Sequence, residues 1–120
     1  MEKIKSYVVS ESQTIKEAIY VIKNDHARCA IVVNKANKVI GVFSEGDVLN
    51  AFLQGIDVHA SLKSVIKPSF LYLKEKDLAA AHQLIKKYGI TLIPIVDNSF
   101  NLKDVITIFE VMDLLSFSKK

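Results

Sequence analysis

The sequence has very little of what marks secreted or membrane-spanning proteins. Only one of its 120 residues is a cysteine, Cys29, which has no partner for a disulfide and therefore fits a reduced, cytoplasmic setting. The longest unbroken apolar run, Cys29–Val33, is five residues long, whereas a membrane-spanning helix needs about 20. Because Met1–Lys5 leads into no longer apolar stretch, we expect neither a secretory signal nor a membrane partner.

The sequence is equally poor in the patterns of nucleic-acid binding and catalysis. Its 16 basic and 13 acidic side chains leave a net charge of +3 without a dense basic run, so we expect a solvated surface and no nucleic-acid partner. The histidines His26, His59 and His82 have the spacing of no metal motif, and no metal site is expected. No glycine-rich phosphate loop or nucleophile elbow is present. We therefore expect that the protein is not an enzyme.

What the sequence does contain is an internal repeat. Half of the residues are hydrophobic, which is enough for one core, and two copies of a single unit fill nearly the whole chain at an offset of 63 residues. We expect the register to slip by one residue between the first helix and the following strand, and then to recover. The aligned segments are Thr14–Ala18 with Asp77–Ala81, Ala30–Val32 with Pro94–Val96, and Gly41–Ser44 with Asp104–Thr107.

Each copy has the element order β-α-β-β-α. A capping box predicts the start of one helix at Thr14 and Glu17, while Asp77 and Gly89 are expected to cap the equivalent helix of the second copy. Apolar periodicity predicts the helices, and apolar runs joined by polar turns predict hairpins. The predicted strands are Ser6–Val9, Cys29–Val33 and Val39–Phe43 in the first copy, and Phe70–Leu73, Thr91–Val96 and Leu102–Ile106 in the second.

Two segments resemble the CBS motif family. Gly41–Asp47 resembles the family pattern of a glycine, two hydrophobic residues, serine or threonine, two variable residues and aspartate, and Leu92–Asp97 resembles its proline-containing strand. The resemblance covers essentially the whole chain. It implies a mixed α/β fold in which two CBS motifs, residues 1–60 and 61–120, pack sheet to sheet as one module with pseudo-twofold symmetry.

A finer resemblance concerns the segment from Ser44 to Asp57. It is similar to the CBS pairs attached to sugar nucleotidyltransferases and sugar-phosphate isomerases. This similarity implies that the chain is a fragment or accessory domain of a longer protein, with a fused or separate catalytic domain as its partner.

The family resemblance also implies a ligand and the residues that bind it. The ligand is an adenosine-type nucleotide in the cleft between the motifs, with AMP, ADP, ATP or S-adenosylmethionine as candidates for a regulatory role. Ser44 is expected to contact phosphate or ribose and Asp47 the ribose hydroxyls, with Thr107 and Glu110 in the same roles at a second, degraded pocket. A hydroxyl and an acid three residues apart are also explained by helix capping alone, so both explanations stay open.

Further candidate ligand contacts lie on the strands that follow the first helix of each copy. The resemblance implies that these strands offer their backbone to the base, although a plain core strand explains the same residues. Arg28 comes just before such a strand, and its guanidinium can grip a phosphate with two hydrogen bonds. The strand candidates are Ala30, Ile31, Ile93, Pro94 and Ile95.

Two functions compete at this point. In the first, nucleotide binding shifts the module between two states and so regulates an attached or partner protein. In the second, the module binds no ligand and is a scaffold that forms a homodimer, as CBS modules commonly do through their helices. The candidates for such a dimer contact are Phe52, Leu53, Leu115 and Phe117.

Overall fold

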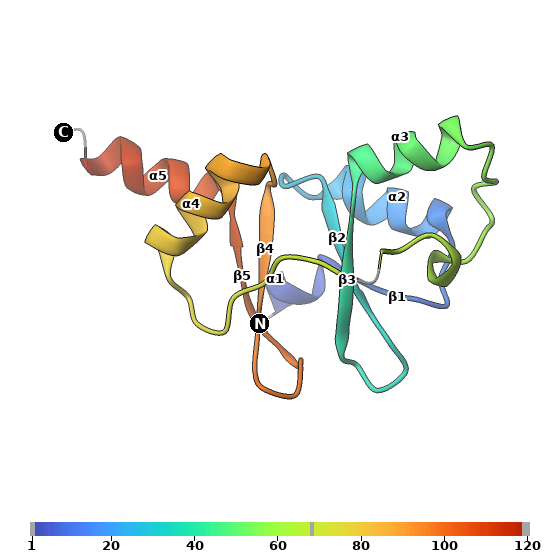
Figure 1. Ribbon diagram of the computed structural model, residues 1–120, viewed down its shortest axis with the longest axis horizontal. Coiled ribbons are helices and arrows are strands. Elements are labelled where there is room, and N and C mark those ends of the chain that lie inside the picture. The colour runs from blue at the N-terminus through green and yellow to red at the C-terminus, as the bar shows by residue number, and fades with distance from the viewer. Residues whose placement is uncertain (1, 68, 119–120) are drawn as a thin grey trace. The chain divides into compact units, whose positions relative to one another are not determined.

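The computed structural model describes residues 2–67 and 69–118, and the side chains of residues 4–67 and 69–114. The chain divides into two compact units, Met1–Phe70 and Leu71–Lys120 (Figure 1). Residues 61–70, which the repeat assigns to the second motif, pack with the first unit, where Leu62 is fully buried in the core. The motif boundary at residue 60 and the sheet-to-sheet packing stay predictions, because a sequence repeat and a packing unit need not share a boundary.

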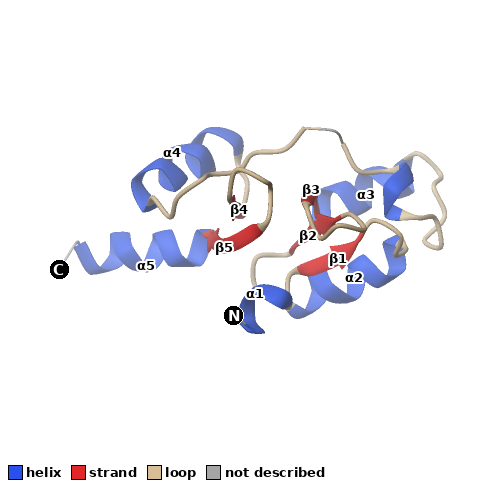
Figure 2. Ribbon diagram, turned by 90° about the horizontal axis from the view of Figure 1, so that it is seen from below, coloured by secondary structure: helices blue, strands red, loops and turns tan. Residues whose placement is uncertain are grey.

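The first unit is a three-stranded sheet with two helices on one face. The sheet order is β1-β2-β3, with β1 parallel and β3 antiparallel to β2. Figure 2 shows α2 and α3 side by side on the same side of this sheet, where they share a core with Ala30, Val32 and Phe43. The elements are α1 (Glu2–Lys5), β1 (Val8–Ser10), α2 (Ile15–Asn24), β2 (Cys29–Val33), β3 (Val39–Ser44), α3 (Glu45–Leu53) and the short 3-10 helix η1 (Leu62–Ser64).

The second unit repeats this plan around a two-stranded sheet. Its helices α4 and α5 contact each other, and Ala81, Ile85, Ile93, Ile106 and Val111 form its core. The mixed α/β fold class is therefore confirmed in both halves. The elements are α4 (Leu78–Tyr88), β4 (Leu92–Val96), β5 (Leu102–Thr107) and α5 (Ile108–Ser118).

Local chemistry starts and ends the helices where the sequence predicts. The Thr14 hydroxyl accepts the Glu17 N–H at 3.2 Å, while the Glu17 carboxylate accepts the Thr14 N–H, so the capping box is complete. Asp77 accepts the Ala80 N–H at 3.0 Å at the start of α4. Gly89 ends α4 in the left-handed conformation with φ 67°, which glycine adopts without steric cost.

The hairpin turns of the two units are copies of each other at the offset of 63. The Asn34 side chain accepts the N–H groups of Ala36 and Lys38 at 2.9 and 3.0 Å. The Asp97 side chain accepts those of Ser99 and Asn101 at 2.8 and 2.9 Å. In both turns the residue three positions after the Asx residue, Asn37 or Phe100, has a φ of 62°. Asx side chains that bind the backbone ahead of them therefore set both turns.

The strand pairing corrects the predicted register slip. Cys29 pairs with Ser44 and Leu92 with Thr107, so the offset of 63 holds from the first residue of each hairpin. The irregularity near the far end also repeats, between Val32 and Val33 and between Ile95 and Val96. The counterpart of Pro94 is therefore Ile31, one residue later than the sequence comparison suggests, because similar apolar residues on a strand align equally well in neighbouring registers.

The first strand of the second copy is also corrected. In the first unit the Ile31 N–H donates to the Tyr7 carbonyl at 2.7 Å as part of the β1–β2 ladder. Pro94 takes the place of Ile31 and has no N–H to donate. The predicted strand Phe70–Leu73 is consequently reduced to a single bridge, in which Leu73 bonds to Pro94 and Val96 at 3.1 and 2.9 Å. The first-copy strand also lies slightly later than predicted, at Val8–Ser10.

The second helix of each unit leaves much of its apolar surface exposed. In α3 only Val48 and Ala51 are buried, whereas Leu49 is 60%, Phe52 45% and Leu53 88% exposed. In α5, Val111 is buried while Met112 and Leu114 are about half exposed. The side chains of Leu115 and Phe117 lie outside the described residues. Among the helices that the structure describes, none has the length and apolar character needed to cross a bilayer.

Candidate functional site

The first candidate site is the junction between β3 and α3. Ser44 ends the strand in an extended conformation and caps the helix. Its hydroxyl accepts the Asp47 N–H at 3.3 Å and donates to Asp47 Oδ2 at 3.0 Å, and Asp47 Oδ2 also accepts the Ser44 N–H at 2.8 Å. Both side chains are half-buried. The capping explanation therefore accounts for the contacts between these two residues.

The cap leaves half of the Asp47 carboxylate unused. A carboxylate has about four lone-pair positions, two on each oxygen. The two hydrogen bonds from Ser44 both end on Oδ2, and Oδ1 has no hydrogen-bond partner among the described residues. Two hydroxyl groups of one ligand match the two open positions on Oδ1. Asp47 can thus cap its helix and bind a diol at the same time.

The start of α3 is a weaker anion site than a bare helix end. The Glu45 N–H donates to the Arg28 carbonyl at 3.2 Å, and the Asp47 N–H donates to Ser44. Of the first three N–H groups of α3, those of Glu45, Gly46 and Asp47, only that of Gly46 has no acceptor among the described residues. The Ser44 proton is committed to Asp47. A phosphate contact by Ser44 would have to break that bond.

The turn between α2 and β2 lies beside this junction. Arg28 is exposed and adopts a left-handed backbone with φ 55°, while Cys29 behind it is buried and pairs with Ser44. Burial, together with the negative charges of Asp25 and Asp47, raises the pKa of the Cys29 thiol to about 12. Burial also raises the pKa of Asp25, whose Oδ2 is buried without a hydrogen-bond partner. Sequence reasoning missed Asp25, because nothing marks it apart from its place at the end of a helix.

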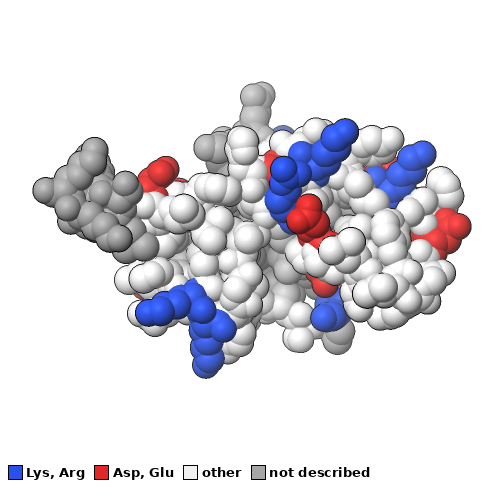
Figure 3. All heavy atoms as spheres, turned by 90° about the horizontal axis from the view of Figure 1, so that it is seen from above, with Lys and Arg blue, Asp and Glu red and all other residues white. Residues whose placement is uncertain are grey.

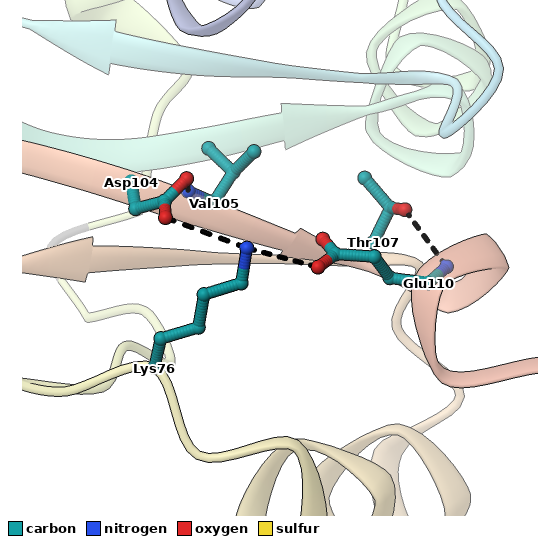
Figure 4. Close-up of polar contacts among 5 residues, drawn as sticks. All are labelled: Lys76, Asp104, Val105, Thr107 and Glu110. Carbon is teal, nitrogen blue, oxygen red and sulfur yellow. Dashed lines mark hydrogen bonds and ion pairs between the residues drawn. The ribbon is translucent and has the colours of Figure 1, made fainter. Parts of the chain in front are cut away.

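The second candidate site, between β5 and α5, has a different set of contacts (Figure 4). The Thr107 hydroxyl accepts the Glu110 N–H at 3.3 Å, as expected of a cap. The Glu110 carboxylate lies 2.9 Å from Lys76 Nζ, and Asp104 lies 3.5 Å from the same nitrogen. The hydrogen bond and charge of Glu110 raise the pKa of Lys76. Sequence reasoning also missed Lys76, which precedes α4 in a loop and belongs to no motif.

The strand candidates lie in the cores of the two units. Ala30, Ile31 and Ile93 are fully buried, Ile95 is 1% exposed and Pro94 is among the largest fully buried side chains. Every position of β4 is buried. The backbone of Ile31 is partly used as well, because its N–H donates to Tyr7. The structure thus brings Ser44, Asp47 and the Arg28 backbone together, and places these strand side chains away from solvent.

A further site would require a concentration of charged or metal-binding side chains. On the face drawn in Figure 3, basic and acidic side chains are scattered among uncharged ones. Among the described residues, no three His, Cys, Asp or Glu side chains lie close enough to hold a metal ion.

Comparison with known proteins supports a CBS assignment for the first half. Residues 2–54 match the family described as CBS domain. An uncharacterized protein of Helicobacter pylori is 26% identical over 109 residues, which cover 89% of this chain and 33% of that protein. Arabinose 5-phosphate isomerase KdsD of Francisella tularensis is 23% identical over the same length, again covering 89% and 33%. The chain thus spans about a third of the length of the curated relatives it matches.

Solved structures match the fold of more than nine-tenths of the chain. A CBS domain protein from Pyrobaculum aerophilum complexed with AMP superposes with a TM-score of 0.75 at 18% identity, covering 94% of this chain and 91% of that one. The cytosolic domain of the Mg²⁺ channel MgtE in complex with ATP superposes with a TM-score of 0.71 at 22% identity, covering 91% and 45%. The fold is therefore that of CBS-domain proteins.

Proposed function

We propose that this chain is a cytoplasmic regulatory module, a pair of CBS motifs, and that its first strand-to-helix junction binds the ribose of an adenine nucleotide through Asp47. The role is regulatory rather than catalytic. The similar structures from Pyrobaculum aerophilum and of MgtE, which contain AMP and ATP, support the ligand class. The same fold and the match of residues 2–54 to the CBS domain support the module.

One observation carries the site assignment. Asp47 Oδ2 accepts both hydrogen bonds that Ser44 donates, and Oδ1 keeps two open lone-pair positions. A ribose offers two adjacent hydroxyl donors, which fit one carboxylate oxygen. Arg28 is exposed next to this junction and is proposed to meet the phosphate. The strand residues Ala30 and Ile31 are proposed to contribute shape rather than polar contacts.

The substitution Asp47→Asn separates the two tasks of Asp47. The amide oxygen of asparagine can accept both cap hydrogen bonds, while its NH₂ group replaces the acceptor that a diol needs. We expect AMP affinity, measured by isothermal titration calorimetry, to fall at least tenfold, since a hydrogen bond to a charged group contributes about 1.5–3 kcal/mol. The matched control is Asp77→Asn, the same change at the cap of α4. Equal affinity of Asp47→Asn and wild type would refute the assignment.

A ligand panel tests the nucleotide class. We expect at least one of AMP, ADP and ATP to stabilise the protein by about 2.7 kcal/mol at 100 times its dissociation constant. The 2′-deoxy form of that nucleotide should bind less tightly, because one of the two hydroxyl donors to Asp47 is missing. S-Adenosylmethionine belongs in the panel because the sequence resemblance names it. No response to any nucleotide would refute the sensor function.

The regulated activity is proposed to lie in another part of a longer protein. The matched relatives are about three times as long as the matched region, and one of them is an arabinose 5-phosphate isomerase. We propose that this chain is the accessory domain of a protein of that kind. The test is whether AMP changes the activity of the longer protein and whether Asp47→Asn removes that change.

A homodimer is the second candidate function, favoured by the exposed apolar residues of α3. Leu49, Phe52 and Leu53 expose 45–88% of their surface, and burying a leucine is worth about 1.5–3 kcal/mol. We propose that a second copy covers them, with or without nucleotide. Sedimentation should give a dimer for wild type, a monomer for Leu53→Ser, and a dimer for the control Tyr88→Ser on α4, where Tyr88 is 52% exposed. A wild-type monomer at high concentration would refute the dimer.

A further inference from the structure

We propose that Lys76 is an internal counter-ion that closes the second junction, so that the chain binds one nucleotide rather than two. The inference rests on the proposed function. Lys76 Nζ lies 2.9 Å from Glu110 and 3.5 Å from Asp104, and the three side chains are about 40% exposed. Figure 4 shows the lysine reaching between the two carboxylates.

The offset of 63 identifies what the first copy has at these positions. Lys76 corresponds to Gln13, Asp104 to Gly41 and Glu110 to Asp47. Gln13 supplies no charge, and its side chain contacts Glu17 at 2.9 Å and the Ser10 N–H at 2.8 Å. At these three positions the second copy therefore has one acid and one base more than the first. Both junctions keep a formal charge of −1 from these three positions.

The two acids differ in what they leave for a ligand. Asp47 turns back onto its own cap through one oxygen and keeps the other open. Glu110 has a longer side chain, and its carboxylate meets the Lys76 ammonium instead. The ion pair engages Glu110 Oε2, and the carboxylate charge that would strengthen a hydrogen bond from a ribose hydroxyl is already shared with the Lys76 ammonium. The acid that corresponds to Asp47 is thus already compensated by a cation, and a ribose hydroxyl would gain less from it.

The charges also argue against Lys76 as a phosphate ligand. One ammonium lies between two carboxylates, so the local charge stays negative. If a phosphate drew Lys76 away, Asp104 and Glu110 would lose their shared cation close to an incoming anion. An electrically neutral glycine, as at Gly41, imposes no such repulsion. The geometry therefore favours closure over phosphate capture.

An exchange of residues between the copies tests the inference. The triple variant K76Q/D104G/E110D gives the second junction the residues of the first. Isothermal titration calorimetry with AMP should report one site per chain for wild type and two for the triple variant. The single variant K76Q should remain at one site, because it leaves two uncompensated carboxylates. A triple variant that folds, by circular dichroism, and still binds one AMP would overturn the inference.

A second measurement needs no change at the second junction. Because the first junction is then the only open one, Asp47→Asn should remove all high-affinity AMP binding. Two sites in wild type, or one site remaining in Asp47→Asn with unchanged affinity, would overturn the closure while leaving nucleotide binding by the module intact. Failure of both the wild type and the triple variant to bind any nucleotide would instead overturn the proposed function, and the inference with it.

Discussion

Replacing Ser44 with alanine tests whether the main role of its hydroxyl is to cap α3 or to contact a ligand. The change removes the acceptor of the Asp47 N–H and the donor to Asp47 Oδ2, at 3.3 and 3.0 Å. Loss of a serine cap costs about 0.5–2 kcal/mol. Since two half-buried hydrogen bonds are lost together, we expect about 1.5 kcal/mol. With a urea dependence of about 1.5 kcal/mol per molar, the unfolding midpoint should fall by about 1 M.

The control for this prediction is the equivalent cap of the second copy. Thr107→Ala removes one recorded hydrogen bond, to the Glu110 N–H, while Lys76 continues to hold the Glu110 side chain. Its cost should therefore be smaller than that of Ser44→Ala, about 1 kcal/mol. If Ser44→Ala left the urea midpoint unchanged and yet abolished AMP binding, the hydroxyl would be a ligand contact, and the reasoning from the cap would be wrong.

Three further predictions concern packing, backbone and ionisation. Leu62→Ala should destabilise the protein by about 2–5 kcal/mol in urea unfolding because Leu62 is fully buried. The control Leu53→Ala, at an 88% exposed position, should change the stability of the isolated chain little. Equal effects of the two substitutions would contradict the position of Leu62 in the core. Gly89→Ala should cost about 1 kcal/mol at φ 67°, whereas Gly46→Ala, where the new Cβ meets nothing closer than 3.7 Å, should be close to neutral by the same assay. The Cys29 thiol, with its pKa raised to about 12 by burial, should resist alkylation at pH 8 until urea unfolds the chain, and fast alkylation of the native protein would refute the burial. Because the thiol of the unfolded chain loses its proton at a lower pH than that of the folded chain, the free energy of unfolding should fall as pH rises above 9.

Local chemistry explains most of what the sequence could predict. Thr14 with Glu17, Asp77 and Gly89 act on residues within four positions, so their caps can be recognised without knowing the fold. The hairpin turns at Asn34 and Asp97 depend on equally short-range bonds. The fold class followed from such signals together with the repeat, and so did the element order apart from the first strand of the second copy.

The errors arose where a residue acts on a distant one. The loss of the strand before α4 depends on which residue of β4 lies opposite, and the sequence comparison misplaced Pro94 by one position. Lys76 reaches Asp104 and Glu110 across 28 and 34 residues of chain, and only folding brings them together. Spacing along a chain carries no information on such contacts.

The proline in β4 also makes the two copies unequal in how readily they open. In the first unit β2 is held from both sides, by three paired residues of β1 and by β3. Among the described residues of the second unit, β4 has a strand on one side and only the Leu73 bridge on the other. Amide hydrogens of β4 should therefore exchange with deuterated solvent faster than those of β2, since fewer neighbouring hydrogen bonds must break together. The two copies of one repeat thus differ in dynamics: the first half is better protected against hydrogen exchange, and the second half opens more easily.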